Sequence, residues 1–159
     1  MAGAWRQVTV SGVAATILSG LVLQVAAMAG LPAPNLALWA GTLITLHLGT
    51  ATAVGYVLEL LAGVGLARLY LALIRHRRRS TVLRGMAYGL LLWALVMTIG
   101  LPLFGRVSPL VGNGLLLDPG FFSLQFGPSA PVIWLVTLEM FGASLGLLMG
   151  DAITRWPPG

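Results

Sequence analysis

The amino-acid sequence predicts an all-α integral membrane protein, a four-helix bundle whose N and C termini both lie in the cytoplasm. Three observations predict this fold. The 159-residue chain is 58% hydrophobic and only 8% charged, whereas a soluble domain carries about a quarter charged residues. Its apolar residues form long runs of the roughly 20 residues that a membrane-spanning helix needs. Most of its arginines gather in one short segment between two such runs.

The apolar runs predict four spans within a single transmembrane domain, over residues 8–29, 50–74, 82–103 and 130–152. Two further segments, residues 36–49 and 106–129, are interrupted by Gly, Pro and polar residues, and we expect both at the outer interface. A continuous helix over residues 36–74 is the alternative, but it would be about 60 Å long, twice the hydrocarbon thickness. We expect Gly100-Leu101-Pro102 to end the third span, and a short helix near residues 121–125.

The arginine cluster predicts the orientation. It comprises Arg75, Arg77, Arg78, Arg79 and Arg84, and the chain contains no Lys. Basic loops beside membrane spans lie predominantly on the cytoplasmic side. The net charge of +5 is then explained by topology and by anionic lipid headgroups, and it does not indicate nucleic-acid binding.

The two halves of the chain resemble each other as two span–loop–span repeats. Gly12-Val13-Ala14-Ala15 before Gly30-Leu31-Pro32 corresponds to Gly85-Met86-Ala87-Tyr88 before Gly100-Leu101-Pro102. The second and fourth spans each carry one Glu with a glycine a few residues later, in Glu59-Leu60-Leu61-Ala62-Gly63 and Glu139-Met140-Phe141-Gly142. Repeats of two spans would be related by an axis along the membrane normal. A duplication and the general likeness of apolar segments are both open interpretations.

Small residues recur every fourth position along the predicted spans, which places them on one face of each helix. Such faces let helix backbones approach closely within a membrane. The glycines that we expect to mediate packing are Gly12, Gly20, Gly55, Gly63, Gly85, Gly89, Gly142, Gly146 and Gly150. Gln24 shares the face of Gly12 and Gly20, and it would need a hydrogen-bond partner there.

Glycines and prolines of the second half resemble a known family. Gly85-xxx-Gly89 precedes Gly100-Leu101-Pro102-Leu103-Phe104-Gly105, and Gly127-Pro128-Ser129-Ala130-Pro131 leads into a span with Gly142 and Gly146. This pattern resembles the YagU-like family of small four-helix proteins of the bacterial inner membrane, over most of residues 12–150. The resemblance implies a multi-pass protein of that membrane, but no activity. Family members carry His near the positions of Glu59 and Glu139, so no role of those histidines transfers to this chain.

Glu59 and Glu139 are the strongest candidates for chemistry, since both lie about 13 Å from the outer ends of their predicted spans at 1.5 Å per residue. Ionisable groups at such depths usually face a bundle interior or a cavity. Two interpretations are open. The carboxyls relay protons or bind a cation, or they are protonated and hydrogen-bond between helices, with Gln24 or Thr137 as partners.

Metal and cofactor chemistry have little support in the sequence. The absence of Cys excludes disulfides and thiolate metal sites. His47 could ligate a haem or chlorin metal through its imidazole, but a lone His in an outer segment is more often an ordinary polar residue. His76 lies in the basic turn, on the opposite side, so no Ser-His-Asp set is expected. We interpret most of the tryptophans as interface anchors; they are Trp5, Trp39, Trp93, Trp134 and Trp156.

These patterns predict a non-catalytic accessory subunit, not an enzyme, that packs within a larger respiratory or photosynthetic membrane complex. Its expected partners are other membrane subunits or a second copy of itself, together with anionic lipid headgroups. We expect no cofactor of its own beyond lipid contacts, and a pigment or haem contact from partner subunits is left open. The alternative is a small oligomeric transporter or channel that moves protons or a small solute past Glu59 and Glu139.

Overall fold

The computed structural model describes residues 2–74 and 81–150, and within these ranges all regular structure is helical. The elements are, in order, α1 (Ala2–Met28), α2 (Leu36–Thr42), α3 (Leu48–Ile74), α4 (Val82–Leu95), η1 (Val96–Gly100), α5 (Leu101–Val107), α6 (Pro109–Gly112), η2 (Phe121–Phe126) and α7 (Ala130–Leu148). In this part of the chain four stretches are long and apolar enough to cross a membrane, namely Trp5–Met28, Leu48–Ile74, Val82–Val107 and Ala130–Leu148. Their length and composition indicate a multi-pass membrane protein.

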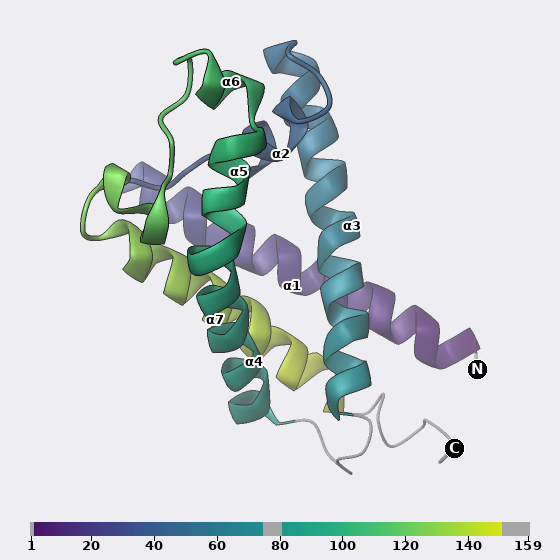
Figure 1. The fold of residues 1–159 in the computed structure, drawn as a ribbon. Coiled ribbons are helices and arrows are strands. Elements are labelled where there is room, and N and C mark those ends of the chain that lie inside the picture. The colour runs from purple at the N-terminus through teal and green to yellow at the C-terminus, as the bar shows by residue number, and fades with distance from the viewer. Residues whose placement is uncertain (1, 75–80, 151–159) are drawn as a thin grey trace.

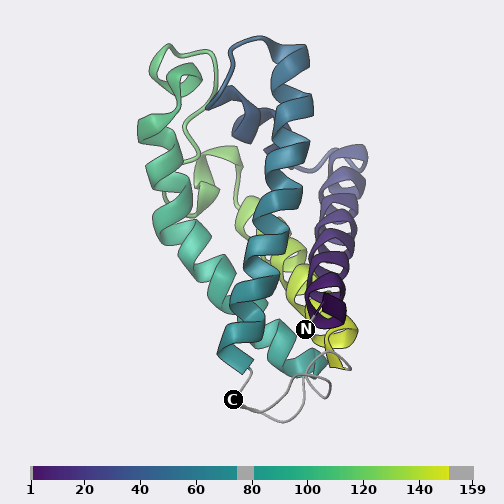
Figure 2. The same ribbon diagram turned by 90° about the vertical axis from the view of Figure 1, so that its right-hand side faces the viewer.

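The long helices form two crossing pairs. α1 packs against both α3 and α7, and α4 packs against α7. Figure 1 shows α1 and α7 running obliquely across the more upright α3 and α4, and Figure 2 shows α1 beside α3. The start of α1, the end of α3 and the start of α4 lie at one end of the molecule, here called the lower end. α2 and α6 lie at the opposite, upper end (Figure 1).

The first helix starts earlier than predicted, at Ala2 instead of residue 8. Two polar contacts hold its first turns against neighbouring helices. The side-chain amide of Gln7 donates to the carbonyl of Leu148 at 3.2 Å, one of the last α7 carbonyls, which have no donor in their own helix. The guanidinium of Arg68 lies over the ring of Trp5, 5.3 Å from its centroid. The prediction at residue 8 concerned the apolar span, and the helix extends before it through residues that make these polar contacts.

The third span continues past Pro102, and the prediction that Gly100-Leu101-Pro102 ends the helix is wrong. α4 leads into the π-helical segment η1, after which the N–H of Leu101 bonds to the carbonyl of Val96. α5 then extends the span to Val107. Proline lacks an N–H and its ring clashes with the preceding turn of an ordinary α-helix. The wider π turn relieves this conflict, so the helix continues where a break was expected.

The two predicted outer segments contain shorter helices than expected. Within residues 36–49 only α2 forms a separate helix, and the last residues already belong to α3. The side-chain oxygen of Asn35 caps α2 by accepting from the N–H of Leu38 at 3.0 Å. Within residues 106–129 the short helical elements are α6 and η2. η2 spans the helix expected near residues 121–125, but it is interrupted at Phe122 and Ser123, whose φ angles are positive at 55°. Of the fourth predicted span, residues 151–152 lie outside the described residues.

α2 packs closely on the upper half of α3 (Figure 1). A Cβ added at Gly41 would overlap the carbonyl of Ala51, and one at Gly55 would overlap the carbonyl of Ala37. The two backbones therefore touch where only glycine leaves room. This contact fixes the upper half of α3 against α2.

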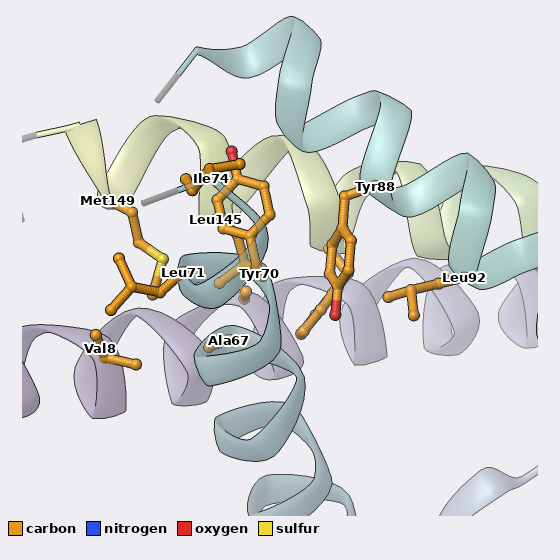
Figure 3. Packing of buried hydrophobic residues seen from close by; sticks show 11 residues of the cluster. Val8, Ala67, Tyr70, Leu71, Ile74, Tyr88, Leu92, Leu145 and Met149 are labelled. Atoms are coloured by element: carbon orange, nitrogen blue, oxygen red, sulfur yellow. The ribbon is translucent and has the colours of Figure 1, made fainter. Parts of the chain in front are cut away.

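The lower core joins all four spans around two tyrosines (Figure 3). The rings of Tyr70 and Tyr88 lie 5.2 Å apart between centroids, and the hydroxyl of Tyr88 donates to the carbonyl of Leu66 at 2.9 Å. A buried tyrosine is stable when its hydroxyl finds such an acceptor. The cluster is completed by Val8, Ala15, Ala67, Leu71, Ile74, Leu92, Phe141, Leu145 and Met149.

The upper core is aromatic. Trp39 stacks on Phe104, with ring centroids 5.1 Å apart, and Trp93 donates its indole N–H to the carbonyl of Pro131 at 2.9 Å. Trp134 is only 4% exposed. The interpretation of these tryptophans as interface anchors is therefore wrong for Trp39 and Trp134. Phe104 of α5 and Phe126 of η2 contact the ring of Trp39, and Trp134 packs in the same cluster with its indole N–H buried without a hydrogen-bond partner.

Candidate functional site

A cleft of about 500 Å³ lies between α1 and α3 and is closed above by residues 33–37. Below it the two helices touch, since a Cβ at Gly63 would overlap the side chain of Thr16. Because the helices cross obliquely (Figure 1), they separate above this contact and leave the cleft. Leu21 and Tyr56 on its lining are 51% and 54% exposed. The cleft is therefore open at the side of the molecule, between the two helices.

Three polar side chains on the cleft wall have no partner within the chain. They are Gln24 from α1 and Tyr56 and Glu59 from α3, and none makes a hydrogen bond in the described structure. Thr16, in contrast, donates its hydroxyl proton to the carbonyl of Gly12 at 2.9 Å. Tyr56 and Glu59 lie well inside their span, where an unsatisfied polar group costs several kcal/mol, whereas Gln24 lies four residues before the end of α1. The cleft thus presents hydrogen-bonding groups that no other described part of the protein satisfies.

Glu59 lies near the middle of its span. It is half-buried and stands about 17 Å along the axis from Leu48, at 1.5 Å per residue. Among the lining residues it is the only acidic one, and none of them is basic. Ionising a carboxyl at this depth without a cation beside it is costly. The neutral, protonated form of Glu59, which can both donate and accept a hydrogen bond, is therefore favoured.

Glu139 lies on α7, outside the cleft lining. Its Oε2 atom is buried without a hydrogen-bond partner. The hydroxyl of Thr137, the partner considered from the sequence, donates instead to the carbonyl of Ile133 at 2.8 Å. Glu139 borders the contact of α7 with α4, because a Cβ at Gly89 would lie 3.0 Å from its Cα. The described structure contains no hydrogen bond between Glu59 and Glu139.

The two helix pairs cross through similar glycine contacts. Between α1 and α3, a Cβ at Gly12 would lie 2.9 Å from the carbonyl oxygen of Gly63. Between α4 and α7, a Cβ at Gly85 would overlap the carbonyl of Gly142. Gly12 and Gly85 are equivalent positions of the proposed repeat, whereas Gly63 and Gly142 differ by one residue in their spacing from Glu59 and Glu139. Both crossings bring backbone against backbone. The two crossings are alike in their close glycine contacts, and the duplication of a span–loop–span unit stays a prediction.

Two of the glycines expected to pack do not do so within the described chain. A Cβ at Gly20 or at Gly150 would meet no atom within 4 Å. Gly20 instead lines the cleft, where the missing side chain leaves space. Gly146 makes the close helix contact that was expected of it, since a Cβ there would lie 2.5 Å from the carbonyl oxygen of Thr81.

Arg84 is the one member of the predicted basic cluster that lies within the described residues. The others, Arg75, Arg77, Arg78 and Arg79, lie outside them. Arg84 occupies the first turn of α4, where its N–H donates to the side-chain oxygen of Thr81 at 3.3 Å. Arg106 lies in the last turn of α5, at the upper end. Arg6 and Arg68 both belong to the lower end, on the first turns of α1 and the last turns of α3.

His47 is exposed in the connection between α2 and α3. Its backbone N–H donates to the hydroxyl oxygen of Thr45 at 3.3 Å. In the described ranges no group of three His, Cys, Asp or Glu side chains comes together to hold a metal ion. His76 lies outside those ranges. A role of His47 as a metal or pigment ligand gains no support from its surroundings.

The cleft itself was not predicted from the sequence, and of its three unpartnered polar residues the sequence analysis singled out Gln24 and Glu59 but not Tyr56. Gly20 and Gln24 are four positions apart on α1, and Tyr56 and Glu59 are three apart on α3, so each pair shares a helix face. These spacings are the available signal. That the two faces meet around one cavity depends on how α1 and α3 cross, which no local pattern specifies.

No family model matches this chain, and no curated protein or solved structure proved similar to it. The resemblance to the YagU-like family therefore stays a prediction. The protein is defined by its own architecture, as an all-helical, multi-pass membrane protein with a lateral cleft of mixed polar and apolar lining.

Proposed function

We propose that the protein is a non-catalytic accessory subunit of a larger membrane complex, of the respiratory or photosynthetic kind. One observation carries the proposal. Gln24, Tyr56 and Glu59 lie on a laterally open cleft without hydrogen-bond partners in the described chain. Lipid tails cannot supply those partners. A second molecule at this surface would supply them, which supports a role of the chain within an assembly.

The proposal includes a four-helix bundle in the bacterial inner membrane, with its lower end and both termini in the cytoplasm. Arg6, Arg68 and Arg84 belong to the lower end and Arg106 to the upper end. The sequence adds a run of arginines between α3 and α4. This distribution supports a cytoplasmic lower end by the positive-inside rule, where the arginines would also contact anionic headgroups.

A small transporter that uses Glu59 and Glu139 is the competing proposal. Its support is the buried Oε2 of Glu139, which has no hydrogen-bond partner, an uncommon state for a purely structural carboxyl. A relay, however, needs the two groups to exchange protons. Glu59 faces the cleft between α1 and α3, whereas Glu139 borders the contact of α7 with α4. The subunit proposal does not need such a connection.

Affinity purification after extraction in a mild detergent tests the subunit proposal. The tagged chain is expected to bring down other membrane proteins in a fixed ratio, and an unrelated tagged multi-pass protein from the same membrane serves as the control. Crosslinking in intact membranes, performed before extraction, guards against loss of partners in detergent. A chain that crosslinks only to itself and purifies alone would overturn the proposal.

A further inference from the structure

We propose that the cleft between α1 and α3 binds one neutral, lipid-soluble small molecule whose carbonyl or hydroxyl end hydrogen-bonds to Glu59 and Gln24. The inference rests on the proposed function in one respect: it identifies the second molecule that completes the cleft as a small ligand held within the assembly. Four properties of the cleft lead to this ligand class, namely its size, its apolar wall, its charge and its unused polar groups.

The size of the cleft fits a small molecule. Its volume of about 500 Å³ lies within the range of roughly 300–1,000 Å³ found for small-molecule sites. An α-helix with its side chains is about 10 Å wide, so the same volume would enclose only about one turn of it. A helix of a partner subunit would therefore lie across the mouth of the cleft and would not fill it.

The apolar wall and the lateral opening fit the hydrophobic part of such a ligand. Ile17, Leu21 and Leu23 line the cleft from α1, and Leu60 lines it from α3. Leu21 and Tyr56 are each about half exposed, at 51% and 54%, which places the opening on the lipid-facing side. A molecule dissolved in the bilayer would reach the cleft from the lipid without crossing water.

The charge of the lining selects a neutral ligand. No Lys, Arg or His is among the lining residues, so an anionic lipid would meet a carboxyl without a cation to balance it. A cationic ligand would need an ionised Glu59 near the middle of the span, where ionisation is costly. A protonated Glu59 donates a hydrogen bond to a carbonyl or hydroxyl oxygen, and the amide of Gln24 offers both a donor and an acceptor.

The other two polar side chains of the lining each make one hydrogen bond within the chain, although the side-chain NH2 of Asn35 makes none. Thr16 donates to the carbonyl of Gly12, and the side-chain oxygen of Asn35 accepts from the N–H of Leu38. This leaves Gln24, Tyr56 and Glu59 as the groups that face the cleft without a partner. The polar end of the ligand is therefore expected beside Glu59, with its apolar part extending toward the opening.

Two glycine variants test whether the cleft is the site. A Cβ at Gly20 or at Gly65 would meet no atom within 4 Å, so both tolerate a side chain, but only Gly20 lines the cleft. Native mass spectrometry of the purified full-length chain would measure binding of decylubiquinone, a neutral carbonyl probe, and of farnesol, a neutral hydroxyl probe. We expect one bound molecule of at least one probe per chain for the wild type and for Gly65→Leu, and none for Gly20→Leu.

Substitutions of Glu59 test the chemistry. Glu59→Gln keeps a donor and an acceptor, so binding should stay within about threefold of wild type, whereas Glu59→Leu should weaken it about tenfold through the lost hydrogen bond.

Oleate and dodecyltrimethylammonium serve as anionic and cationic probes of similar hydrophobicity, and neither should bind specifically. The inference is overturned if neither neutral probe binds the wild type, if Gly20→Leu binds as wild type does, or if a charged probe binds better than both neutral ones.

The same variants separate this inference from the subunit proposal. If Gly20→Leu loses the probe yet retains its protein partners on affinity purification, the ligand site stands and the partners bind elsewhere. If Gly20→Leu loses its protein partners while the wild type binds neither neutral probe, a partner protein covers the cleft and the small-ligand inference fails. If the wild type binds a probe but purifies without partners, the subunit proposal fails and the ligand site stands.

Discussion

Single glycines decide how closely the spans approach one another. At Gly85 and Gly142 a neighbouring backbone occupies the place that a Cβ would take, so any larger residue must push two helices apart. At Gly20 and Gly65 that place is empty. The same residue type therefore has opposite roles, closing a helix contact at one position and keeping space open at another. The recurrence of small residues every fourth position shows which glycines share a helix face. It does not show which of them contacts a neighbouring helix.

Gly146→Leu should destabilise the contact between α4 and α7. A Cβ at Gly146 would lie 2.5 Å from the carbonyl oxygen of Thr81 and 3.0 Å from the Cα of Val82. Because backbone atoms cannot move aside easily, we expect a loss of about 1–3 kcal/mol from overpacking. Thermal unfolding in detergent measures it. Leu147→Ile, at a neighbouring residue that is 70% exposed, is the matched control, and equal midpoints for the two variants would contradict the close contact.

At the scale of elements, hydropathy located the four long helices, because a run of about 20 apolar residues is by itself enough to identify a membrane-spanning helix in a sequence. It did not predict that the third helix continues past Pro102, since the π turn before it is a matter of backbone geometry. Nor did it predict that Trp39 and Trp134 are buried, because the rings that cover them come from distant segments. Of the cleft residues, Gln24 and Glu59 were recognisable as polar groups within the spans, whereas Tyr56 was not singled out. Their meeting on one wall follows from the crossing of α1 and α3.

Gly41→Ala should loosen α2 from α3. The added Cβ would overlap the carbonyl of Ala51, whereas one added at Gly49, on α3 itself, would meet nothing within 4 Å. We therefore expect Gly41→Ala to lose about 1–3 kcal/mol of stability through overpacking, while Gly49→Ala is neutral or slightly stabilising because alanine favours the helix. Thermal unfolding of both variants checks this. Similar destabilisation by both substitutions would argue against the tight packing of α2.

At the scale of the whole molecule, the two ends are built differently. The lower core mixes aliphatic residues with a tyrosine pair, while the upper core is dominated by tryptophan and phenylalanine rings. Arginines belong mainly to the lower end, where the sequence also places the basic turn. The proposed orientation brings this end to the cytoplasmic headgroups, and it leaves the aromatic end and the short helices α2 and α6 at the outer surface.

Cysteine labelling in intact cells checks this orientation. The chain has no native Cys, so single cysteines can be read without background. We expect Ser80→Cys to be protected from a membrane-impermeant maleimide and Leu115→Cys to be labelled. Leu115 is 73% exposed between α6 and η2, which makes it a better site than the fully buried Ser123 of the same segment. Labelling at position 80 with protection at position 115 would reverse the proposed topology.

The central claim is that the intramembrane carboxyls serve binding and assembly and do not carry protons. The double variant Glu59→Gln with Glu139→Gln tests it most directly, because Gln keeps the size and hydrogen-bonding capacity of a protonated Glu but cannot exchange a proton. Reconstituted in proteoliposomes, wild type and double variant should show the same proton and cation permeability, and in cells both should retain the same co-purifying partners. A double variant that assembles normally yet loses a proton or cation flux present in the wild type would contradict the claim and establish the transporter.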